Sequence, residues 1–322
     1  MKALEVCEHS GPSSVNLVER DMPEVKGDRV LVRVTAAGVN FADVAQSRGL
    51  YPGGPQAPYL GGLEAAGVVE QAGPDSPIPV GTRVMGLGSR AFAEYVCWPA
   101  GLCFPTPDHW TDTQAAAFPV QWLTAHACLR TVGRLEAGDN VLIHAAAGGV
   151  GQAAVHLARH FGAWVIGTAG SASKCEQVLA RGAHAAINYR DEDFVSRVRE
   201  ITEGDGIDLC LEMVGGDTFR KNLRVLRPFG RMVVYGAASN EPASVANVPL
   251  IFNPVEVIGY HLMRMMRDRP DLFGQQWTEM VSLIAQGVVQ PEEPSVAPLE
   301  EGAEVLGRLE RRETTGKWVL TP

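Results

Sequence analysis

The chain has 322 residues, of which 46% are hydrophobic and 20% charged, a composition typical of a folded globular protein and not of a disordered one. At about 150 residues per domain, this length predicts two compact units. The 37 acidic and 28 basic residues give a net charge of −9, which repels a phosphate backbone, so nucleic acid is not an expected partner.

The first residues and the cysteines indicate the cellular compartment of the protein. Glu5 stands where a secretory signal would begin its apolar segment. The longest stretch without Asp, Glu, Lys or Arg, residues 140–158, contains His144 and Gln152, which hydrocarbon would solvate poorly. The six cysteines are scattered, without a Cys-x-x-Cys pair. We therefore expect a cytoplasmic protein with reduced thiols and no membrane association.

The first third of the chain is rich in short β-type runs. They occupy residues 29–35, 65–70, 83–85 and 93–97, and clusters of Gly and Pro such as residues 51–55 separate them. Runs of this length between turn-forming residues are typical of a compact β-rich unit with irregular loops.

From about residue 137 the pattern changes to apolar runs that alternate with helix-length amphipathic segments. The runs are residues 141–144, 164–167, 185–188, 207–211, 231–235 and 255–259. This alternation predicts an α/β unit with a doubly wound parallel sheet. A helix-like segment, 273–286, and a final β-type run, 316–320, are too short to fold alone and should complete the first unit. We therefore assign residues 1–119 and 262–322 to the β-rich unit and 120–261 to the parallel sheet.

A glycine-rich turn follows the first of these runs, in the sequence VLIHAAAGGVG over residues 141–151. Such a turn lets backbone N–H groups approach a pyrophosphate at a helix N-terminus. Gly148 would allow the close approach and Gly151 the packing of helix on strand, although Ala146 replaces the first glycine of the usual fingerprint. The alternative, a closely packed helix start without a ligand, is disfavoured by the six-strand pattern. The expected contacts are Ala147, Gly148, Gly149, Val150 and Gly151.

The end of the second run decides between NADH and NADPH. An acidic residue there would bind the ribose 2′-hydroxyl of NAD, but no acid occurs between Phe161 and Cys175. Lys174 and nearby hydroxyls could instead bind a 2′-phosphate, which favours NADPH. The alternative is that Lys174 is only a solvated helix residue. The expected contacts are Thr168, Gly170, Ser171, Ser173 and Lys174.

Several motifs resemble a known family. They are GVNFAD at 38–43, RGLYP at 48–52, GLEAAGV at 62–68, AAAGGVG at 145–151 and the closing Gly-Lys at 316–317. Together they resemble the medium-chain dehydrogenase/reductases, and among these the zinc-independent, zeta-crystallin-like quinone oxidoreductases. The resemblance covers nearly the whole chain and implies a Rossmann-type sheet plus a β-rich GroES-like domain.

Zinc ligands of related alcohol dehydrogenases are replaced in this chain. The resemblance places their catalytic Cys at Asn40 and their His at Leu63, beside Glu64. Neither replacement supplies a thiolate or an imidazole, and the four closely spaced cysteines of their structural zinc lobe are absent from the sequence. No metal site is expected, and alcohol oxidation, which needs a Lewis acid, is disfavoured.

The resemblance implies an oxidoreductase that transfers hydride from NADPH to a quinone. An alternative is an enone or enoyl-thioester reductase, in which a carbon–carbon double bond is reduced, and a third is a protein that binds NADPH without turnover. Both reductions leave negative charge on an oxygen to be held by hydrogen-bond donors, for which the resemblance offers Asn40 and Tyr51. Competing interpretations are that Asn40 only caps a helix and that Tyr51 only packs in a turn.

Further contacts of a small-molecule substrate and cofactor follow from the same resemblance. Thr124 is expected near the nicotinamide, Val214 and Gly215 near the ribose-nicotinamide end, and Tyr189 near the 2′-phosphate. Gly236 is a further expected cofactor contact, and the alternative for Tyr189 is that it only ends a strand. The run 255–259 would be the edge of the sheet, and relatives pair this edge across a two-fold axis. We therefore expect a homodimer.

Overall fold

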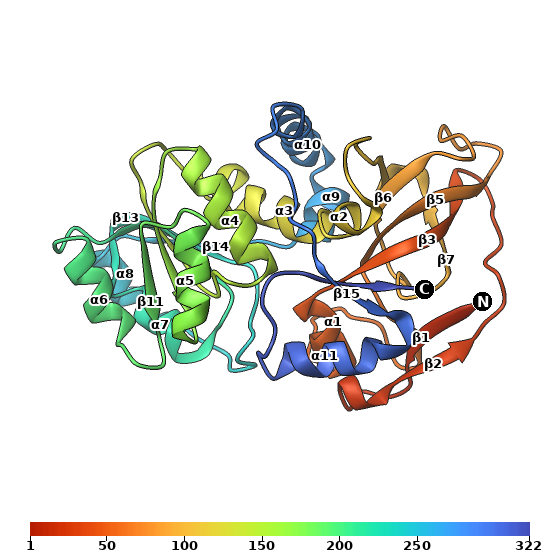
Figure 1. Ribbon diagram of the computed structural model, residues 1–322. Helices are drawn as coiled ribbons and strands as arrows, with labels where there is room; N and C mark the ends of the chain where they lie inside the picture. Colours follow the sequence, from red (N-terminus) through yellow and green to blue (C-terminus); the bar gives the residue numbers. More distant parts are fainter. The chain divides into compact units, whose positions relative to one another are not determined.

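The computed structural model describes residues 1–322, with the exception of the side chain of Pro249. The chain forms two compact units, one of residues 1–120 with 290–322 and one of residues 121–289 (Figure 1). Both termini therefore lie in the first unit. The predicted division placed residues 262–289 in the first unit, whereas the contacts group this segment with the second.

The first unit is built around β3 (Arg29–Val39), which pairs antiparallel with three other strands of a seven-stranded sheet. Most of β3 is buried, which explains its dense run of Val, Leu and Ala. The other strands are β5 (Glu64–Ala72), β6 (Arg83–Leu87), β7 (Tyr95–Pro99), β8 (Cys103–Pro105), β15 (Ser295–Pro298) and β16 (Trp318–Thr321). Since β16 pairs with β3, the C-terminal segment completes this unit as predicted.

A second, three-stranded sheet of this unit has the order β2-β1-β4. Its strands are β1 (Lys2–Val6), β2 (Val15–Glu19) and β4 (Tyr59–Leu60). Helices α1 (Phe41–Ser47) and α11 (Gly302–Glu310) pack against each other, and α2 (Asp112–Ala116) packs on β3 and β5. The core includes Leu4, Val32, Phe92, Trp98 and Leu320, all nearly inaccessible.

The second unit contains a six-stranded parallel sheet in the order β11-β10-β9-β12-β13-β14. Its strands are β9 (Asn140–Ile143), β10 (Trp164–Ala169), β11 (Ala185–Asn188), β12 (Ile207–Glu212), β13 (Leu226–Val234) and β14 (Glu256–Gly259), and the helices between them are α4 (Gly149–His160), α5 (Ala172–Ala180), α6 (Phe194–Ile201) and α7 (Gly216–Asn222). This order is that of a dinucleotide-binding Rossmann sheet, so the predicted fold class is confirmed.

Two helices explain why residues 262–289 belong to the second unit. Helix α9 (Leu262–Asp268) leads into α10 (Pro270–Ala285), which buries Gln276 and Met280. The Gln276 amide donates to the Leu123 carbonyl in α3 (Pro119–His126) at 2.5 Å, and His126 lies 3.1 Å from Glu279. Polar contacts of buried side chains therefore fix α10 on α3.

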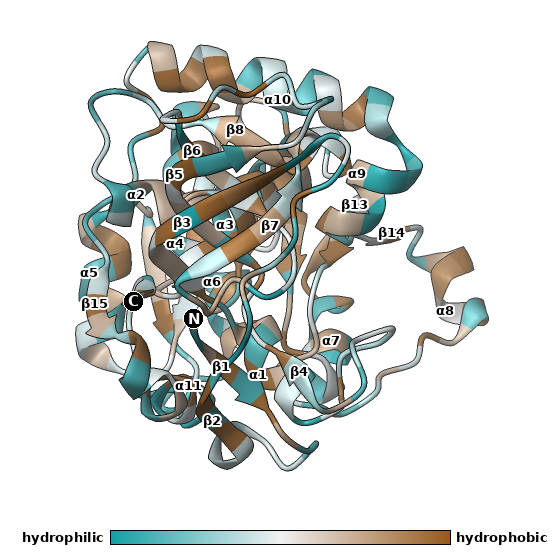
Figure 2. Ribbon diagram, turned by 90° about the vertical axis from the view of Figure 1, so that its right-hand side faces the viewer, coloured by the Kyte–Doolittle hydropathy of each residue, from teal (hydrophilic) through white to brown (hydrophobic). Residues whose placement is uncertain are grey.

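The edge strand β14 lies beside exposed apolar residues. Helix α8 (Asn247–Phe252) precedes it, and Figure 2 shows part of this helix in the hydrophobic colour. Ile251 and Phe252 expose 72% and 84% of their surface. Phe229, whose N–H donates to the Pro254 carbonyl, is also exposed, and so is Val257 on the edge strand itself. These residues form the α8–β14 surface.

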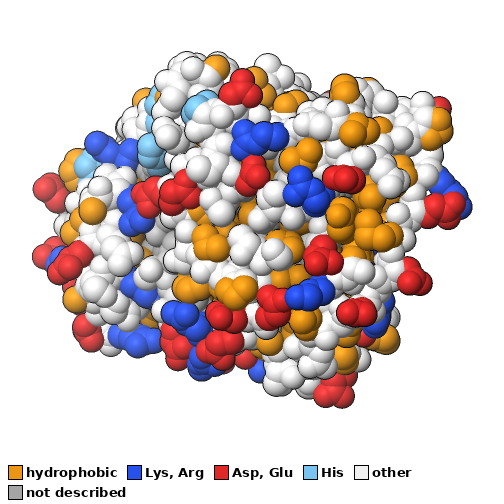
Figure 3. Space-filling view, turned by 45° about the vertical axis from the view of Figure 1, so that its right-hand side comes forward, with side chains coloured by type: hydrophobic (Ala, Val, Ile, Leu, Met, Phe, Trp, Pro, Cys, Tyr) orange, Lys and Arg blue, Asp and Glu red, His pale blue; other side chains and the backbone are white. Residues whose placement is uncertain are grey.

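Other large apolar side chains are exposed elsewhere, among them Leu50, Val80 and Val296. Figure 3 shows acidic and basic side chains interspersed with hydrophobic ones over one face. Ion pairs of the chain include Arg48 with Glu310 and Arg83 with Asp112, both at 2.7 Å. Within the described part of the chain, every helix is too short or too polar to cross a bilayer.

Candidate active site

Glu64 is the centre of a buried polar cluster in the first unit. Its side chain is inaccessible, and its Oε1 accepts hydrogen bonds from Asn40 Nδ2 at 2.7 Å and from Lys317 Nζ at 2.5 Å. Its Oε2 accepts from the backbone N–H of Val120 at 2.6 Å. Lys317 also donates to Asn40 Oδ1 at 2.7 Å. A carboxylate is stable at this depth because an ammonium and two further donors surround it.

The pairing of three strands brings these side chains together. Asn40 directly follows β3, Glu64 begins β5 on one side of β3, and Lys317 precedes β16 on the other side. Gly38 makes the approach possible, since a Cβ there would lie only 2.5 Å from Glu64 Oε1 and from the Ala116 carbonyl. The glycine of the GVNFAD motif is therefore required by Glu64.

The amide of Asn40 is fully used within this cluster. Its Oδ1 accepts from Lys317, and its Nδ2 donates to Glu64 and to the Gly38 carbonyl, the latter at 3.3 Å. Both amide hydrogens are thus directed to the protein, which differs from the expected donor role toward a substrate. Asn40 also caps α1, because Asp43 Oδ2 accepts its backbone N–H at 2.8 Å.

Lys317 is the functional candidate that sequence reasoning missed. Its side chain is 7% exposed and carries a positive charge beside Asn40. Only its place in the closing Gly-Lys motif marked it in the sequence. An ammonium has three N–H groups, and the contacts with Asn40 and Glu64 use two of them.

Tyr51 lies in the loop between α1 and β4 and is half-buried. Burial raises the pKa of its hydroxyl, and the neighbouring Asp43 raises the pKa further. The hydroxyl therefore keeps its proton at neutral pH and can donate a hydrogen bond. The loop packs closely here, as a Cβ at Gly54 would lie 3.0 Å from the Tyr51 carbonyl.

In the second unit, the glycine-rich turn has the geometry of an anion site. Gly148 caps α4 and has no side-chain oxygen to accept the N–H groups of the first turn. A Cβ at Gly151 would lie 2.3 Å from the Ala145 carbonyl, and one at Gly149 would lie 2.3 Å from Gln121 Oε1, so neither position admits a side chain without movement. The turn therefore fits a bound diphosphate.

Cationic side chains gather near the end of β10. Ser171 caps α5, its Oγ accepting the N–H of Lys174 at 3.3 Å, and a Cβ at Gly170 would lie 2.6 Å from the Tyr189 hydroxyl oxygen. Burial and the nearby charge of Arg190 lower the pKa of Lys174. Two like charges held this close suit a phosphate. Arg190, next to the selected Tyr189, is a further candidate that sequence reasoning missed.

A hydrogen-bonded chain links three strand ends of the sheet. Thr168 bonds His144 Nδ1 at 3.0 Å, His144 Nε2 bonds Asn222 at 2.7 Å, and Asn222 donates to Glu212. Burial lowers the pKa of His144, so the ring is neutral. Glu212 in turn accepts the N–H groups of Val214 and Gly215, both at 2.6 Å. The Val214 carbonyl accepts the N–H of Ser239 at 2.8 Å, so these contacts fix the loop after β12 in one conformation.

The remaining predicted residues are placed as follows. Thr124 is buried in α3, and Ala147 is buried in the glycine-rich turn. Val150 and Ser173 lie in the first turns of α4 and α5. Gly236 follows β13, and a Cβ at this position would lie 3.0 Å from the Met213 Cβ, which is a tight contact. Among the described residues, no group of three or more His, Cys, Asp or Glu side chains has the arrangement of a metal site.

Comparison with known proteins agrees with both units. Residues 26–108 match the family of the alcohol dehydrogenase GroES-like domain, and residues 149–286 match the zinc-binding dehydrogenase family. The quinone oxidoreductase of Escherichia coli, solved with NADPH, is 33% identical with a TM-score of 0.93 over 100% of both chains. The CurK enoyl reductase is 28% identical with a TM-score of 0.91, over 99% of this chain and 98% of that one.

A third relative, the synaptic vesicle membrane protein VAT-1 homologue of Danio rerio, is 34% identical over 99% of this chain and 70% of its own length. The chain therefore belongs to the medium-chain dehydrogenase/reductase family, in its zinc-independent quinone oxidoreductase branch.

The ion pair at Glu64 predicts a strong effect on stability. Lys317→Met should lower the free energy of unfolding by about 3–5 kcal/mol, because it leaves a buried carboxylate unpaired. Urea unfolding followed by circular dichroism measures this. In the double variant Glu64→Gln/Lys317→Met most of the loss should be recovered, and a double variant as unstable as Lys317→Met would contradict the pairing.

Proposed function

We propose that the protein is an NADPH-dependent oxidoreductase that reduces a quinone without a metal ion. The buried Lys317–Glu64–Asn40 cluster is the observation that carries this proposal. The zinc-ligand positions of related alcohol dehydrogenases correspond to Asn40 and Leu63, and the carboxylate beside them, Glu64, is neutralised here by an internal ammonium. Neither Asn40 nor Leu63 offers a thiolate or imidazole.

Different residues would bind the cofactor and stabilise the acceptor in such a reaction. Bound NADPH would supply the hydride. The turn at 148–151 would bind its diphosphate, and Lys174, Arg190 and Tyr189 would bind its 2′-phosphate. The Lys317 ammonium and the Tyr51 hydroxyl would stabilise negative charge on the acceptor oxygen, because each carries an N–H or O–H donor. E. coli quinone oxidoreductase, the similar protein solved with NADPH, supports this assignment.

The second candidate function is reduction of a carbon–carbon double bond conjugated to a carbonyl. The similarity to the CurK enoyl reductase supports it, and Tyr51 would be the proton donor to the α-carbon. A quinone takes its protons readily from water, whereas an enolate carbon needs a placed acid. The two chemistries therefore differ in how strongly they depend on the Tyr51 hydroxyl.

Loss of NADPH absorbance with a panel of quinones, enones and enoyl thioesters separates these functions. For a quinone reductase, Tyr51→Phe should lower quinone reduction by about tenfold, because one of two donors is lost, whereas an enoyl reductase also loses its proton donor and should fall by about 1,000-fold or more. Val80→Asp, at an exposed site elsewhere in the first unit, serves as the control. Tight NADPH binding with no acceptor reduced would instead indicate a non-catalytic binding protein.

Cofactor selection predicts a charge-reversal effect. Lys174→Glu should raise the KM for NADPH by about 10- to 100-fold and leave that for NADH nearly unchanged, because only the 2′-phosphate loses a charged partner. Steady-state kinetics with both cofactors measure this. Lys26→Glu, on an exposed side chain of the other unit, is the matched control. Equal effects on both cofactors would contradict the assignment of this site.

We also propose a cytoplasmic homodimer. All six cysteines are free thiols, as a reducing compartment would leave them. The α8–β14 surface offers an unpaired strand edge beside large exposed apolar side chains, which a second copy would cover.

The assembly is tested by light scattering at micromolar concentration. The native protein should have the mass of a dimer, and Phe252→Asp should be monomeric, since it buries a charge in the contact. The control Val80→Asp should remain dimeric. A monomeric native protein would refute the assembly.

A further inference from the structure

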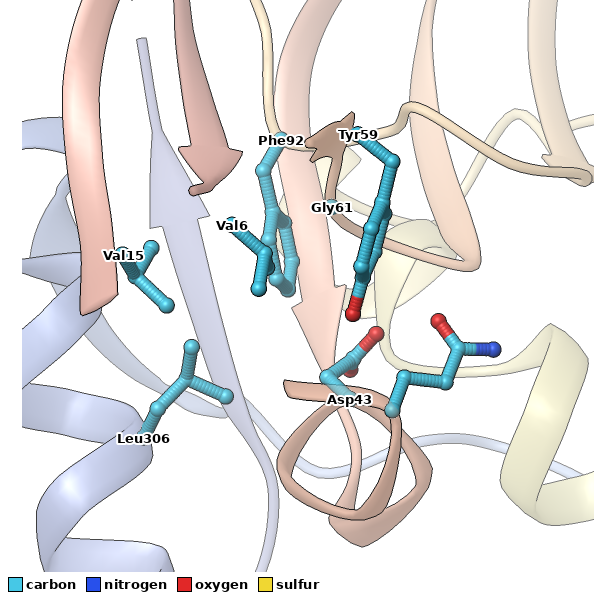
Figure 4. A pocket seen from close by; sticks show the side chains of 8 residues that line it. Val6, Val15, Asp43, Tyr59, Gly61, Phe92 and Leu306 are labelled. Carbon is cyan, nitrogen blue, oxygen red and sulfur yellow. The ribbon is translucent and has the colours of Figure 1, made fainter. Parts of the chain in front are cut away.

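A small cavity lies in the first unit, where β1, β4 and α1 meet. Its walls are mostly apolar and include Val6, Val15, Phe92 and Leu306. Three polar side chains line it, Asp43 and Gln46 of α1 and Tyr59 of β4. Figure 4 shows the Asp43 carboxylate and the Tyr59 hydroxyl pointing toward each other across the cavity.

Both of these side chains hold an unsatisfied polar atom. Among the described residues, Asp43 Oδ1 and the Tyr59 hydroxyl oxygen are buried and have no hydrogen-bond partner. Asp43 is 4% exposed, and its other oxygen, Oδ2, accepts the N–H of Asn40. Buried polar atoms without partners are rare in folded proteins, because each one loses its hydrogen bonds to water and gains no hydrogen bond within the protein. The pair therefore requires a partner that fits between them.

The size of the cavity matches one water molecule. Its volume is about 10 Å³, close to the smallest that holds a water. A water there can donate to Asp43 Oδ1 and accept from the Tyr59 hydroxyl, which satisfies both atoms. Apart from Gln46, the other side chains of the walls are apolar.

We propose that Asp43 and Tyr59 bind one internal water molecule and that this water-bridged pair is a proton-binding site. Gain or loss of the proton sets the charge of Asp43, which lies next to Asn40 and Tyr51. Asp43 is then a positioning residue, since it acts through the backbone of Asn40 and through its charge. The kinetic consequence rests on the proposed function, whereas the water and the proton do not.

The groups around Asp43 decide its charge. Lys317 and Glu64 face it from the strand ends, and Tyr51 and Tyr59 face it from the following loop and strand. The neighbouring charged or titratable groups of the packed elements have their own partners: His9 bonds the Gln46 carbonyl, and Arg48 pairs with Glu310 of α11. The pKa of Asp43 is raised to about 7, chiefly by burial and also by Glu64, against the lowering effects of the Asn40 N–H and of Lys317.

The sign of the kinetic effect follows from this charge. Ionised Asp43 raises the pKa of Tyr51 and opposes negative charge on an acceptor oxygen nearby. Turnover should therefore be faster with Asp43 protonated and fall as pH rises through about 7. A single nearby charge changes a rate by about tenfold.

The pH profile of kcat at saturating NADPH and quinone tests the coupling. Native protein should lose about tenfold in kcat with an apparent pKa near 7, and Asp43→Asn should show no such step. Tyr59→Phe should move the step to higher pH, because the bridging water loses a partner. Asp75→Asn, at an exposed carboxylate of the same unit, should keep the native profile. A step retained in Asp43→Asn would overturn the inference.

Stability tests the proton site without any turnover. A carboxyl whose pKa is raised on folding contributes stability below its ordinary pKa of 3.8, and this contribution is lost as pH rises through about 7. The melting temperature of native protein relative to Asp43→Asn should therefore fall between these two pH values. A difference independent of pH, or a crystal structure with no water in the cavity, would overturn the inference. A pH-linked difference without quinone reduction would contradict only the proposed function.

Discussion

The buried ion pair of Glu64 with Lys317 is the constraint on which the first unit depends. It joins the start of β5 to the residue before β16, on opposite sides of β3, and so ties the C-terminal segment to strands formed some 250 residues earlier. An uncompensated carboxylate at this depth would oppose folding. Gly38 keeps the space open for it, and the Val120 N–H fixes its second oxygen.

A buried glutamate organises the second unit in a similar way. Glu212, at the end of β12, binds two backbone N–H groups of the following loop and is linked through Asn222 and His144 to the end of β10. In each unit, then, an acid inside the protein fixes the loops on which the candidate site residues stand. The site geometry is set by polar contacts that are buried and therefore strong.

Much of the fold was predictable because its strands and turns have local sequence patterns. Short apolar runs marked all six strands of the parallel sheet, and Gly151 was identified from the spacing of glycines after a strand. Lys317 was not, since its role arises from contact with Asn40, 277 residues away. The occupied amide of Asn40 and the second cation, Arg190, were missed for the same reason. The segment 262–289 was misassigned because buried Gln276, whose partner is a distant carbonyl, anchors it.

The central claim is that an internal ammonium, and no metal ion, compensates the carboxylate at the candidate active site. Steady-state quinone reduction by protein treated with a strong chelator and then supplied with zinc tests it most directly. The account predicts that the rate is unchanged by either treatment. A rate that is lost on chelation and returns with zinc would contradict it.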